Sequence, residues 1–325
     1  MTTLGVFGAG AMGANHVRAA RALREWDDVI VVDVDEDKSR AVAERNGFRA
    51  GEDMDDVLTS IDAAIVAVPS DVHEQVVVPL LRQNIDVLLE KPVAAELDAA
   101  ERIAEVAATS RSKVLVGHVE RFNSAVSELL SWAPGAQHVE FRRVSPAGGR
   151  ALGDVVSDLM VHDLDLLLAI ARSRDGHDGI KNLCAQWSAN SEEMCSTLIE
   201  TDGGLTSTVV ASRMHQMKDR KIILTCSDAV IVADMVRQQV SVHRMDRVEF
   251  TDEGGFVRYR QTGSTEIPFL DNGEPLQREQ RHFYQVVSGE AEPIVSLADG
   301  LAAMRLVEQV RCAASHCAKA PALAS

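Results

Sequence analysis

The sequence has little positive charge and no long apolar segment. It carries 33 Lys and Arg against 49 Asp and Glu, which gives a net charge of -16. Such a chain repels a nucleic-acid backbone on average, although a local site can still hold an anionic small molecule. The longest apolar stretch, 155–170, is broken by four ionisable residues and falls short of the roughly 20 apolar residues that span a bilayer. We therefore expect neither nucleic acid nor membrane as a partner.

Cysteine is scarce and shows no C-x-x-C spacing. The cysteines are Cys184, Cys195, Cys226, Cys312 and Cys317. An odd number without paired spacing indicates reduced, mostly buried thiols rather than a disulfide framework. The N-terminus enters an apolar strand without a basic region or a small-residue cleavage site, so it shows no signal peptide. We expect a cytoplasmic protein, without internal repeats or low-complexity segments, whose last residues, 319–325, form a frayed tail.

Strands and helices alternate through the first third of the chain. Short apolar runs occupy residues 4–7, 29–32, 63–68, 87–89 and 114–116. Helix-period segments separate them at residues 14–24, 38–46, 72–83 and 97–109. Strands that are apolar throughout are buried on both faces, and crossover helices join parallel strands. The pattern predicts an α/β domain with a doubly wound parallel sheet.

After residue 118 the pattern changes to strands with alternating polarity. They follow a helical segment at 121–132 and a long helix at 154–171, and they occupy 137–144, 183–189, 194–201, 205–214, 221–226, 230–234 and 239–243. Gly203-Gly204 marks a hairpin between two of them, and two further helices close the chain at 276–287 and 298–315. Successive strands without crossover helices predict an antiparallel sheet. We therefore expect a first domain at 1–118 and a second, α+β domain at 119–325.

The first apolar strand runs into a glycine motif. The motif is Gly8-Ala9-Gly10-Ala11-Met12-Gly13, which opens the first helix of a strand–helix–strand unit. Gly8 suits the tight turn, Gly10 lets the backbone approach a pyrophosphate, and Gly13 allows the helix to pack closely on the strand. The N–H groups at the start of the helix would hold the phosphates. We predict a dinucleotide site that includes Ala11 and Met12.

Asp33 ends the second strand, about twenty residues after Gly13, where a ribose-binding acid is expected. A carboxylate there accepts hydrogen bonds from the ribose hydroxyl groups and repels a 2′-phosphate. NAD is therefore predicted as the cofactor, with NADP disfavoured. The acids at 35–37 are interpreted as a solvated helix start.

Two further segments end strands of the same sheet. Val68 and Pro69 end one strand, and His73 follows in the next helix turn, where it contacts cofactor or substrate or is only a surface residue. Glu90 and Lys91 end another strand, ahead of Pro92, whose peptide bond could be cis or trans. We predict that these residues line the cofactor cleft.

Lys91 is the first catalytic candidate. Ligands of open parallel sheets bind outside the carboxyl ends of the strands, so Lys91 can project toward the nicotinamide. A partly desolvated lysine beside a cationic ring holds its proton less tightly and can exchange it with a substrate hydroxyl. The alternative interpretation is an ordinary surface lysine.

A stripe of ionisable residues on the long helix is the second candidate. Asp154, Asp158, His162 and Asp165 recur at steps of four, four and three, which would place them on one face of an otherwise apolar helix. Such a stripe is costly unless it is paired or faces a wet cleft. Asp158 and His162 suit the holding and deprotonation of a substrate alcohol. A structural stripe remains an alternative, above all for Asp154, and a metal site is disfavoured because no second histidine stands at helical spacing.

Together the glycine motif, Glu90-Lys91-Pro92 and Asp158-x-x-x-His162 resemble the Gfo/Idh/MocA family of oxidoreductases. Glu274-Pro275-Leu276, Glu279 and Phe283 extend the resemblance toward the C-terminus. It implies a Rossmann domain and a second domain with an open-faced sheet, through which a homodimer or homotetramer would pack. It also implies that Lys91 exchanges the proton while Asp158 and His162 position a sugar, sugar nucleotide, cyclitol or related polyol.

Residues 117–123 resemble the subgroup of sugar-nucleotide 3-dehydrogenases, although Ser124 replaces the proline usual in that pattern. Arg121, Asn123 and Asp165 are candidate substrate contacts. Arg121 could equally form a salt bridge between the domains. A basic pocket formed by Arg121, Arg142 and Arg143 would favour a phosphorylated substrate.

The expected function is NAD-dependent hydride transfer to or from a secondary alcohol or its ketone. A cyclitol or free-sugar dehydrogenase is the alternative within the same chemistry. A non-catalytic NAD-binding regulator is the alternative of a different class, and it would not need Lys91, Asp158 and His162. An imine or biliverdin-type reductase is a third alternative, which the polar helix face argues against.

Overall fold

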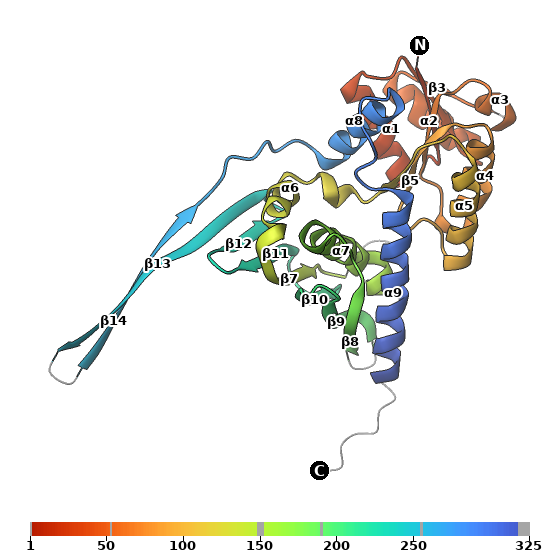
Figure 1. Ribbon diagram of the computed structural model, residues 1–325. Helices are drawn as coiled ribbons and strands as arrows, with labels where there is room; N and C mark the ends of the chain where they lie inside the picture. Colours follow the sequence, from red (N-terminus) through yellow and green to blue (C-terminus); the bar gives the residue numbers. More distant parts are fainter. Residues whose placement is uncertain (1, 53, 148–152, 189–190, 254–255, 318–325) are drawn as a thin grey trace. The chain divides into compact units, whose positions relative to one another are not determined.

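The computed structural model describes residues 2–52, 54–147, 153–188, 191–253 and 256–317 (Figure 1). The chain forms two compact units. The first contains Met1–Phe122 and Gly273–Arg305, and the second contains Asn123–Asn272 and Leu306–Ser325. The sequence predicted a single boundary near residue 118. In the structure, residues 273–305 also belong to the first unit, although the sequence assigned them to the second domain. The predicted tail, 319–325, lies outside the described residues.

Among the helices of these ranges, none combines the length and the apolar character that crossing a bilayer requires.

The first unit contains a six-stranded parallel sheet in the order β3-β2-β1-β4-β5-β6. The strands are β1 (Thr3–Phe7), β2 (Asp28–Val32), β3 (Arg49–Ala50), β4 (Ala63–Val66), β5 (Asp86–Glu90) and β6 (Val114–Gly117). The register aligns Phe7 with Val32 and Val66, and Glu90 with Gly117, so the carboxyl ends form one edge. The order reverses between β1 and β4, which is the topological switch point of a doubly wound sheet. The predicted parallel sheet is confirmed.

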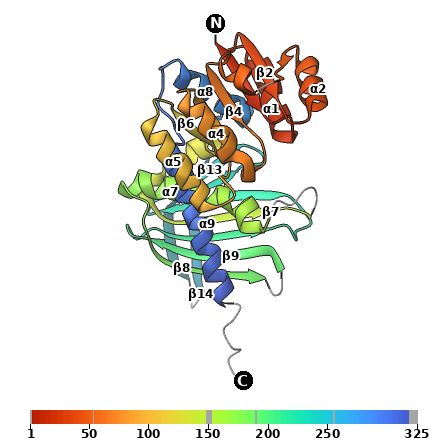
Figure 2. The same ribbon diagram turned by 90° about the vertical axis from the view of Figure 1, so that its right-hand side faces the viewer.

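Helices cover both faces of this sheet, as continuous apolar strands require. One face packs against α1 (Ala11–Leu23), α2 (Glu36–Asn46) and α8 (Pro275–Val287). The other packs against α3 (Met54–Leu58), α4 (His73–Arg82), α5 (Leu97–Thr109) and the start of α9 (Leu297–Cys317). Figure 2 shows α4 and α5 side by side, in agreement with their mutual contacts. The sequence did not assign α8 to this unit, because its apolar face gives no indication of its partner.

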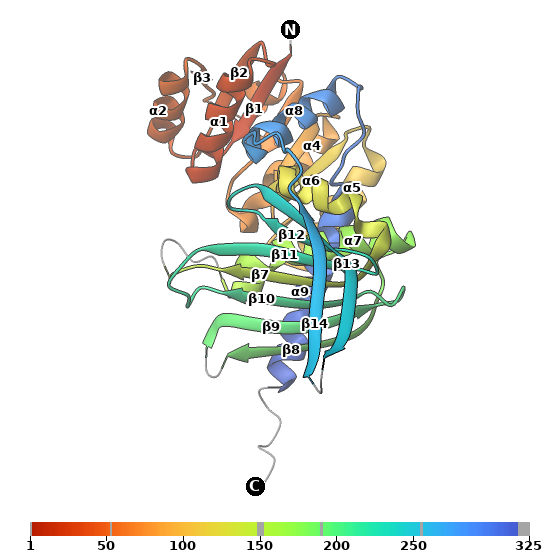
Figure 3. The same ribbon diagram turned by 90° about the vertical axis from the view of Figure 1, so that its left-hand side faces the viewer.

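The second unit contains an eight-stranded sheet in the order β14-β13-β12-β11-β7-β10-β9-β8 (Figure 3). The strands are β7 (Ala136–Val144), β8 (Ile180–Ser188), β9 (Ser191–Thr201), β10 (Thr206–Ser212), β11 (Asp219–Cys226), β12 (Val230–Asp234), β13 (Gln239–Glu253) and β14 (Phe256–Glu266). All neighbours are antiparallel except β7 and β10, which run parallel. The predicted antiparallel sheet is therefore confirmed, with one parallel pair.

Helices α6 (Ser124–Ser131) and α7 (Val161–Asp175) pack on one face of this sheet. In Figure 3 the strands lie in front of α7 and α9, so the opposite face is turned to the viewer. The long ribbon formed by β13 and β14 was predicted only as a strand at 239–243. Residues 244–266 show little alternation of apolar and polar side chains, so the periodicity that identifies a half-buried strand is missing.

The predicted helix at 154–171 has a different start in the structure. A π-helical turn, Val156–Met160, precedes α7. A π turn adds a residue to the turn, so the two steps of four that run through it do not place side chains as an α-helix would, whereas the step of three from His162 to Asp165 lies within α7.

Candidate functional site

The glycine motif forms a tight passage from β1 into α1. Gly8 has φ of 102°, and a Cβ there would lie 2.6 Å from the main-chain oxygen of Ala67. A Cβ on Gly13 would lie 1.7 Å from the main-chain oxygen of Gly8. A Cβ on Gly10, in contrast, would meet no heavy atom within 4 Å. Gly8 and Gly13 are thus required by the fold itself, while Gly10 leaves open space at the start of α1.

The N-terminus of α1 is available to an anion. Gly10 is its N-cap, and no side chain of the described residues caps it by a hydrogen bond. The first N–H groups of a helix have no partner within the helix and carry the positive end of its dipole. Together with the open space at Gly10, this end of α1 suits a phosphate.

Asp33 closes the other side of the loop. Its Oδ2 accepts a hydrogen bond from the N–H of Ala9 at 2.6 Å, and its Oδ1 accepts one from the N–H of Asp35 at 2.9 Å. Each oxygen keeps a further lone pair for a ribose hydroxyl. The carboxylate is therefore fixed against the loop and remains able to accept hydrogen bonds from a ligand.

The cations that follow Asp33 are paired with acids. Lys38 lies 2.9 Å from Asp35, and Arg40 lies 3.2 Å from Asp37. The hydrogen bond with Lys38 holds the pKa of Asp35 below its ordinary value. The local field is thus unfavourable to a 2′-phosphate, in agreement with a preference for NAD.

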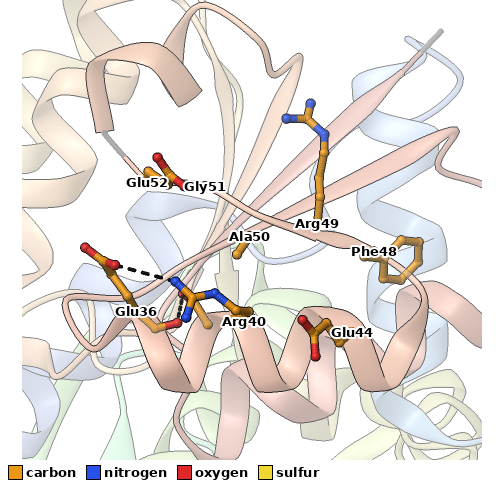
Figure 4. A pocket seen from close by; sticks show the side chains of 9 residues that line it. Glu36, Arg40, Glu44, Phe48, Arg49, Ala50, Gly51 and Glu52 are labelled. Carbon is orange, nitrogen blue, oxygen red and sulfur yellow. Dashed lines mark hydrogen bonds and ion pairs between the residues drawn. The ribbon is translucent and has the colours of Figure 1, made fainter.

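A cavity of about 290 Å³ lies between α2 and β3 (Figure 4). Its lining is Glu36, Ser39, Arg40, Glu44, Phe48, Arg49, Ala50, Gly51 and Glu52. The lining contains neither the glycine loop nor Lys91, and Figure 4 shows the Arg40 guanidinium directed at Glu36. We assign this cavity no part in the chemistry.

His73 connects two strand ends at the carboxyl edge of the sheet. Its Nε2 lies 3.0 Å from the main-chain oxygen of Val68, and its Nδ1 lies 3.1 Å from that of Val93. The ring is buried, and burial lowers the pKa of His73 although both main-chain contacts oppose the shift. His73 thus fixes the segment before Pro69 against the segment after Pro92. The Lys91-Pro92 peptide bond is cis, which the sequence left open.

Lys91 follows directly on β5 and is half-buried. The preceding residue, Glu90, is buried and accepts hydrogen bonds through both oxygens. Its Oε1 lies 2.8 Å from Nε2 of His16, and its Oε2 accepts from the N–H of Lys91 at 3.3 Å. The end of β5 is therefore held by the glutamate beside Lys91 as well as by the sheet.

In the second unit, Asp154 caps the long helix. Its Oδ1 accepts hydrogen bonds from the N–H groups of Val156 and Ser157 at 2.9 and 3.0 Å. Its Oδ2 forms an ion pair with Arg311 at 3.1 Å. Asp154 is thus structural, the alternative that the sequence favoured for this residue.

Asp158 lies in the π turn and forms an ion pair with Arg213, a residue that the sequence did not single out. The two side chains approach to 3.2 Å, and Arg213 also binds Glu193 at 2.7 Å. Arg213 is buried, whereas Asp158 is half-buried. The arginine therefore orients Asp158 and leaves part of its carboxylate accessible. No local pattern around residue 213 indicated this, because the partner lies 55 residues away.

His162 stands in the first turn of α7 and is half-buried, and Asp165 is buried. Between them Asp163 forms an ion pair with Arg143 at 2.8 Å, and both side chains are inaccessible. The basic pocket suggested for Arg121, Arg142 and Arg143 is therefore wrong for Arg143, because its guanidinium is buried and paired with Asp163. Arg142 is also engaged, by Asp219 at 3.1 Å.

The remaining substrate candidates fall in different units. Arg121 is half-buried in a 3-10 turn, Val119–Phe122, of the first unit. Asn123 begins the second unit and caps α6, with its Oδ1 accepting from Ala125 and its Nδ2 donating to the main chain of Met235, both at 3.1 Å. Asn123 thus stabilises the start of α6 and its contact with the main chain of Met235.

A buried cluster in the first unit was not foreseen. His16 on α1, Glu90 on β5 and Glu279 on α8 each place one side-chain atom that could ligate a metal, a ring nitrogen or a carboxylate oxygen, within 4.8 Å of the others. Burial raises the pKa of Glu279 well above its ordinary value, and the nearby Glu90 adds to the shift. The sequence offered Glu279 only as part of a resemblance, because nothing local connects residues 16, 90 and 279.

The structure thus assembles a dinucleotide-binding Rossmann domain. The glycine motif follows the end of β1 and leads into α1, Asp33 follows the end of the adjacent β2, and Val68, Glu90 and Lys91 lie at the same carboxyl edge. Asp158 lies on the π turn of the second unit, and His162 and Asp165 lie on α7.

The N-terminal part of the chain matches the Gfo/Idh/MocA family of oxidoreductases. The model of this family, described as an oxidoreductase family with an NAD-binding Rossmann fold, matches residues 2–118. The cofactor class is therefore NAD, as the sequence predicted.

Three known proteins are similar to this chain in sequence or in fold. It is 24% identical over 241 residues to UDP-N-acetylglucosamine 3-dehydrogenase of Acidithiobacillus ferrooxidans, which covers 74% of this chain and 76% of that protein. A solved structure of that enzyme superimposes with a TM-score of 0.85 and 21% identity over 98% of this chain and 99% of that one.

Inositol 2-dehydrogenase of Leifsonia xyli is 30% identical over 181 residues, 52% of this chain and 53% of that relative. A levoglucosan dehydrogenase in complex with NADH and L-sorbose shares the fold with a TM-score of 0.78 and 16% identity over 97% of each chain. The structural matches therefore extend the shared fold to nearly the whole chain.

Proposed function

We propose that this protein is an NAD-dependent dehydrogenase that transfers hydride between the nicotinamide and a secondary alcohol, or its ketone, of a sugar, sugar nucleotide or cyclitol. The observation that carries the proposal is the position of Lys91. It follows a strand of the NAD-binding sheet, at the carboxyl edge where ligands of open parallel sheets bind. When bound, NAD supplies the hydride acceptor at C4 of its ring.

The residues of the first unit fit this cofactor. The open space at Gly10 and the uncapped start of α1 receive the pyrophosphate. Asp33, fixed by two main-chain N–H groups, accepts hydrogen bonds from the adenosine ribose. His73 holds the strand end at Val68 against the segment that follows Lys91.

Lys91 is the proton-exchanging residue in this proposal. It takes the hydroxyl proton of the substrate in oxidation and returns it in reduction. Asp158 and His162 position the substrate hydroxyl groups, and Arg213 keeps the carboxylate of Asp158 in one orientation. Orientation of this kind supplies a large part of the rate enhancement of such reactions.

Charge and similarity favour different substrate classes. Arg142 and Arg143, which could have bound a phosphate, are neutralised by Asp219 and Asp163. This favours a neutral polyol or cyclitol over a phosphorylated substrate. The similarity to a UDP-N-acetylglucosamine dehydrogenase favours a sugar nucleotide, so both classes belong in the test.

A screen of NAD reduction against free sugars, inositols and nucleotide sugars tests the proposal, with NADP assayed in parallel. We expect turnover with a member of one class and a clear preference for NAD. NADH binding without turnover on any secondary alcohol, in either direction, would instead support the non-catalytic regulator.

We further propose a cytoplasmic homodimer or homotetramer that packs through the open face of the second sheet. That face carries the exposed Leu198 and the cross-strand pair Ile223 and Val232, apolar side chains suited to an interface. Light scattering of the wild type and of Leu198→Asp tests this: the variant should dissociate, and a monomeric wild type would contradict the proposal.

A further inference from the structure

Four polar side chains meet in the core of the first unit. His16, Glu90, Glu279 and Gln280 come from α1, β5 and α8, and their exposures are 0%, 8%, 0% and 0%. Two buried carboxyl groups this close cannot both remain ionised without a compensating charge. The cluster must therefore contain an additional proton or cation.

The hydrogen bonds of Gln280 define the state of His16. Nε2 of Gln280 donates to the main-chain oxygen of His16 at 2.8 Å, which fixes the orientation of the amide because its oxygen could not face that carbonyl. The same nitrogen lies 2.8 Å from Nδ1 of His16, so Nδ1 accepts and the ring proton is on Nε2. That N–H donates to Glu90 at 2.8 Å. His16 is thus neutral, and its Nε2 has no lone pair for a metal ion.

The compensating proton is then carried by a carboxyl group. Glu90 accepts hydrogen bonds from His16 and from the N–H of Lys91, as an ionised carboxylate does. Neither oxygen of Glu279 has a hydrogen-bond partner among the described residues, and its side chain is fully buried. Protonation of Glu279 leaves the pair with one negative charge and gives Glu279 an O–H that can donate to Glu90.

Other charged groups on the elements around α8 do not supply the missing charge. Arg18 on α1 is paired with Glu274, and Arg281 is paired with Glu25 at 2.9 Å. The remaining titratable groups of α8 are Arg278, His282 and Tyr284, and those of the neighbouring turn are His118, Glu120 and Arg121. Glu90 is the charged group that acts on Glu279. Burial lowers the pKa of His282, which favours its neutral form.

We propose that Glu279 is a positioning residue that donates its carboxyl proton to Glu90 and so holds the end of β5, where Lys91 begins, against α1 and α8. The inference deepens the proposed function, because it concerns the backbone that carries the proton-exchanging lysine. This hydrogen bond would join α8 to the strand end at Lys91, and the hydrogen bond from His16 to Glu90 joins that strand end to α1, the helix that follows the glycine loop.

Infrared spectroscopy tests the proton without requiring a substrate. At neutral pH the wild type should show the C=O band of a protonated, buried carboxylic acid, and Glu279→Gln should lack it. Absence of that band from the wild type overturns the proposal, as does a stoichiometric metal ion in the purified protein, measured by mass spectrometry. Neither outcome bears on whether the protein is a dehydrogenase.

Kinetics test the positioning role. Glu279→Leu removes the donor, so kcat should fall about tenfold or more, since a hydrogen bond to a charged group is lost beside Lys91. Glu279→Gln, whose amide can donate as the neutral acid does, should restore most of kcat. In wild type, kcat should decline at alkaline pH as Glu279 ionises, and the Gln variant should lack that decline.

Arg281→Ala, on the exposed side of the same helix, is the matched control and should behave as wild type. Equal losses in the Gln and Leu variants, or an unchanged pH profile in Glu279→Gln, would refute the positioning role. If Glu279→Leu fails to fold, the proposal is still tested by the infrared band of the wild type and by the pH profile of Glu279→Gln.

Discussion

Replacement of Gly10 by Ala separates cofactor binding from folding. Gly10 has φ of -70° and ψ of -168°, a conformation open to alanine, and a Cβ there meets no heavy atom within 4 Å. The cofactor-free protein should therefore keep its stability or gain about 0.4–1 kcal/mol from the stiffer unfolded chain. The new methyl group would, however, occupy the space where the pyrophosphate approaches the backbone. Overpacking of this kind costs about 1–3 kcal/mol, or about 5- to 150-fold in the Kd of NADH.

The assay is a fluorescence titration with NADH beside denaturant unfolding of the cofactor-free protein. Gly13→Ala is the contrasting variant, because its Cβ would lie 1.7 Å from a main-chain oxygen and should damage both stability and binding. Gly135→Ala in the second unit is the matched control, with its nearest neighbour at 3.5 Å. It should leave the Kd of NADH unchanged and show the same small effect on stability as Gly10→Ala. A Gly10→Ala variant of normal stability and unchanged affinity for NADH would refute the role of the loop.

Two further predictions concern the fold around the site. Arg143→Met leaves Asp163 buried without its ion-pair partner and should lower the free energy of unfolding by about 3–5 kcal/mol. Urea unfolding measures the loss, which Arg143→Met combined with Asp163→Leu should largely recover; no recovery would contradict the buried pair. Because burial lowers the pKa of His73 below 6.5, the unfolded chain binds its proton more readily. The free energy of unfolding should therefore fall as the pH drops below 6.5, until the pKa of the folded state is reached. His73→Gln should weaken this pH dependence in unfolding experiments across pH 5–7. If the variant showed the same pH dependence as the wild type, His73 would not be the cause of it.

The sequence predicted those parts of the fold that local patterns determine. Continuous apolar strands indicated a sheet covered on both faces, and the motif from Gly8 to Gly13 located the first turn. Asp33 could be identified because its distance from the glycines is set by one helix and one strand.

Contacts between distant residues could not be predicted in the same way. The cluster of His16, Glu90 and Glu279 depends on α8 returning to the first sheet, and an amphipathic helix does not show in its sequence which surface it covers. The π turn at Val156–Met160 changed the polar stripe on the long helix. Arg213 and Asp163 took part in ion pairs that depend on how the second sheet meets α7.

The central claim is that Lys91 exchanges the proton while the rest of the first unit holds NAD. The most direct measurement compares Lys91→Ala with wild type in two assays, the Kd of NADH and kcat on the substrate that the screen identifies. We predict a loss in kcat of at least about 100-fold with a Kd changed by no more than about twofold, as expected when a general acid–base group is removed. Normal turnover in the variant, or loss of NADH binding equal to the loss of turnover, would contradict the account.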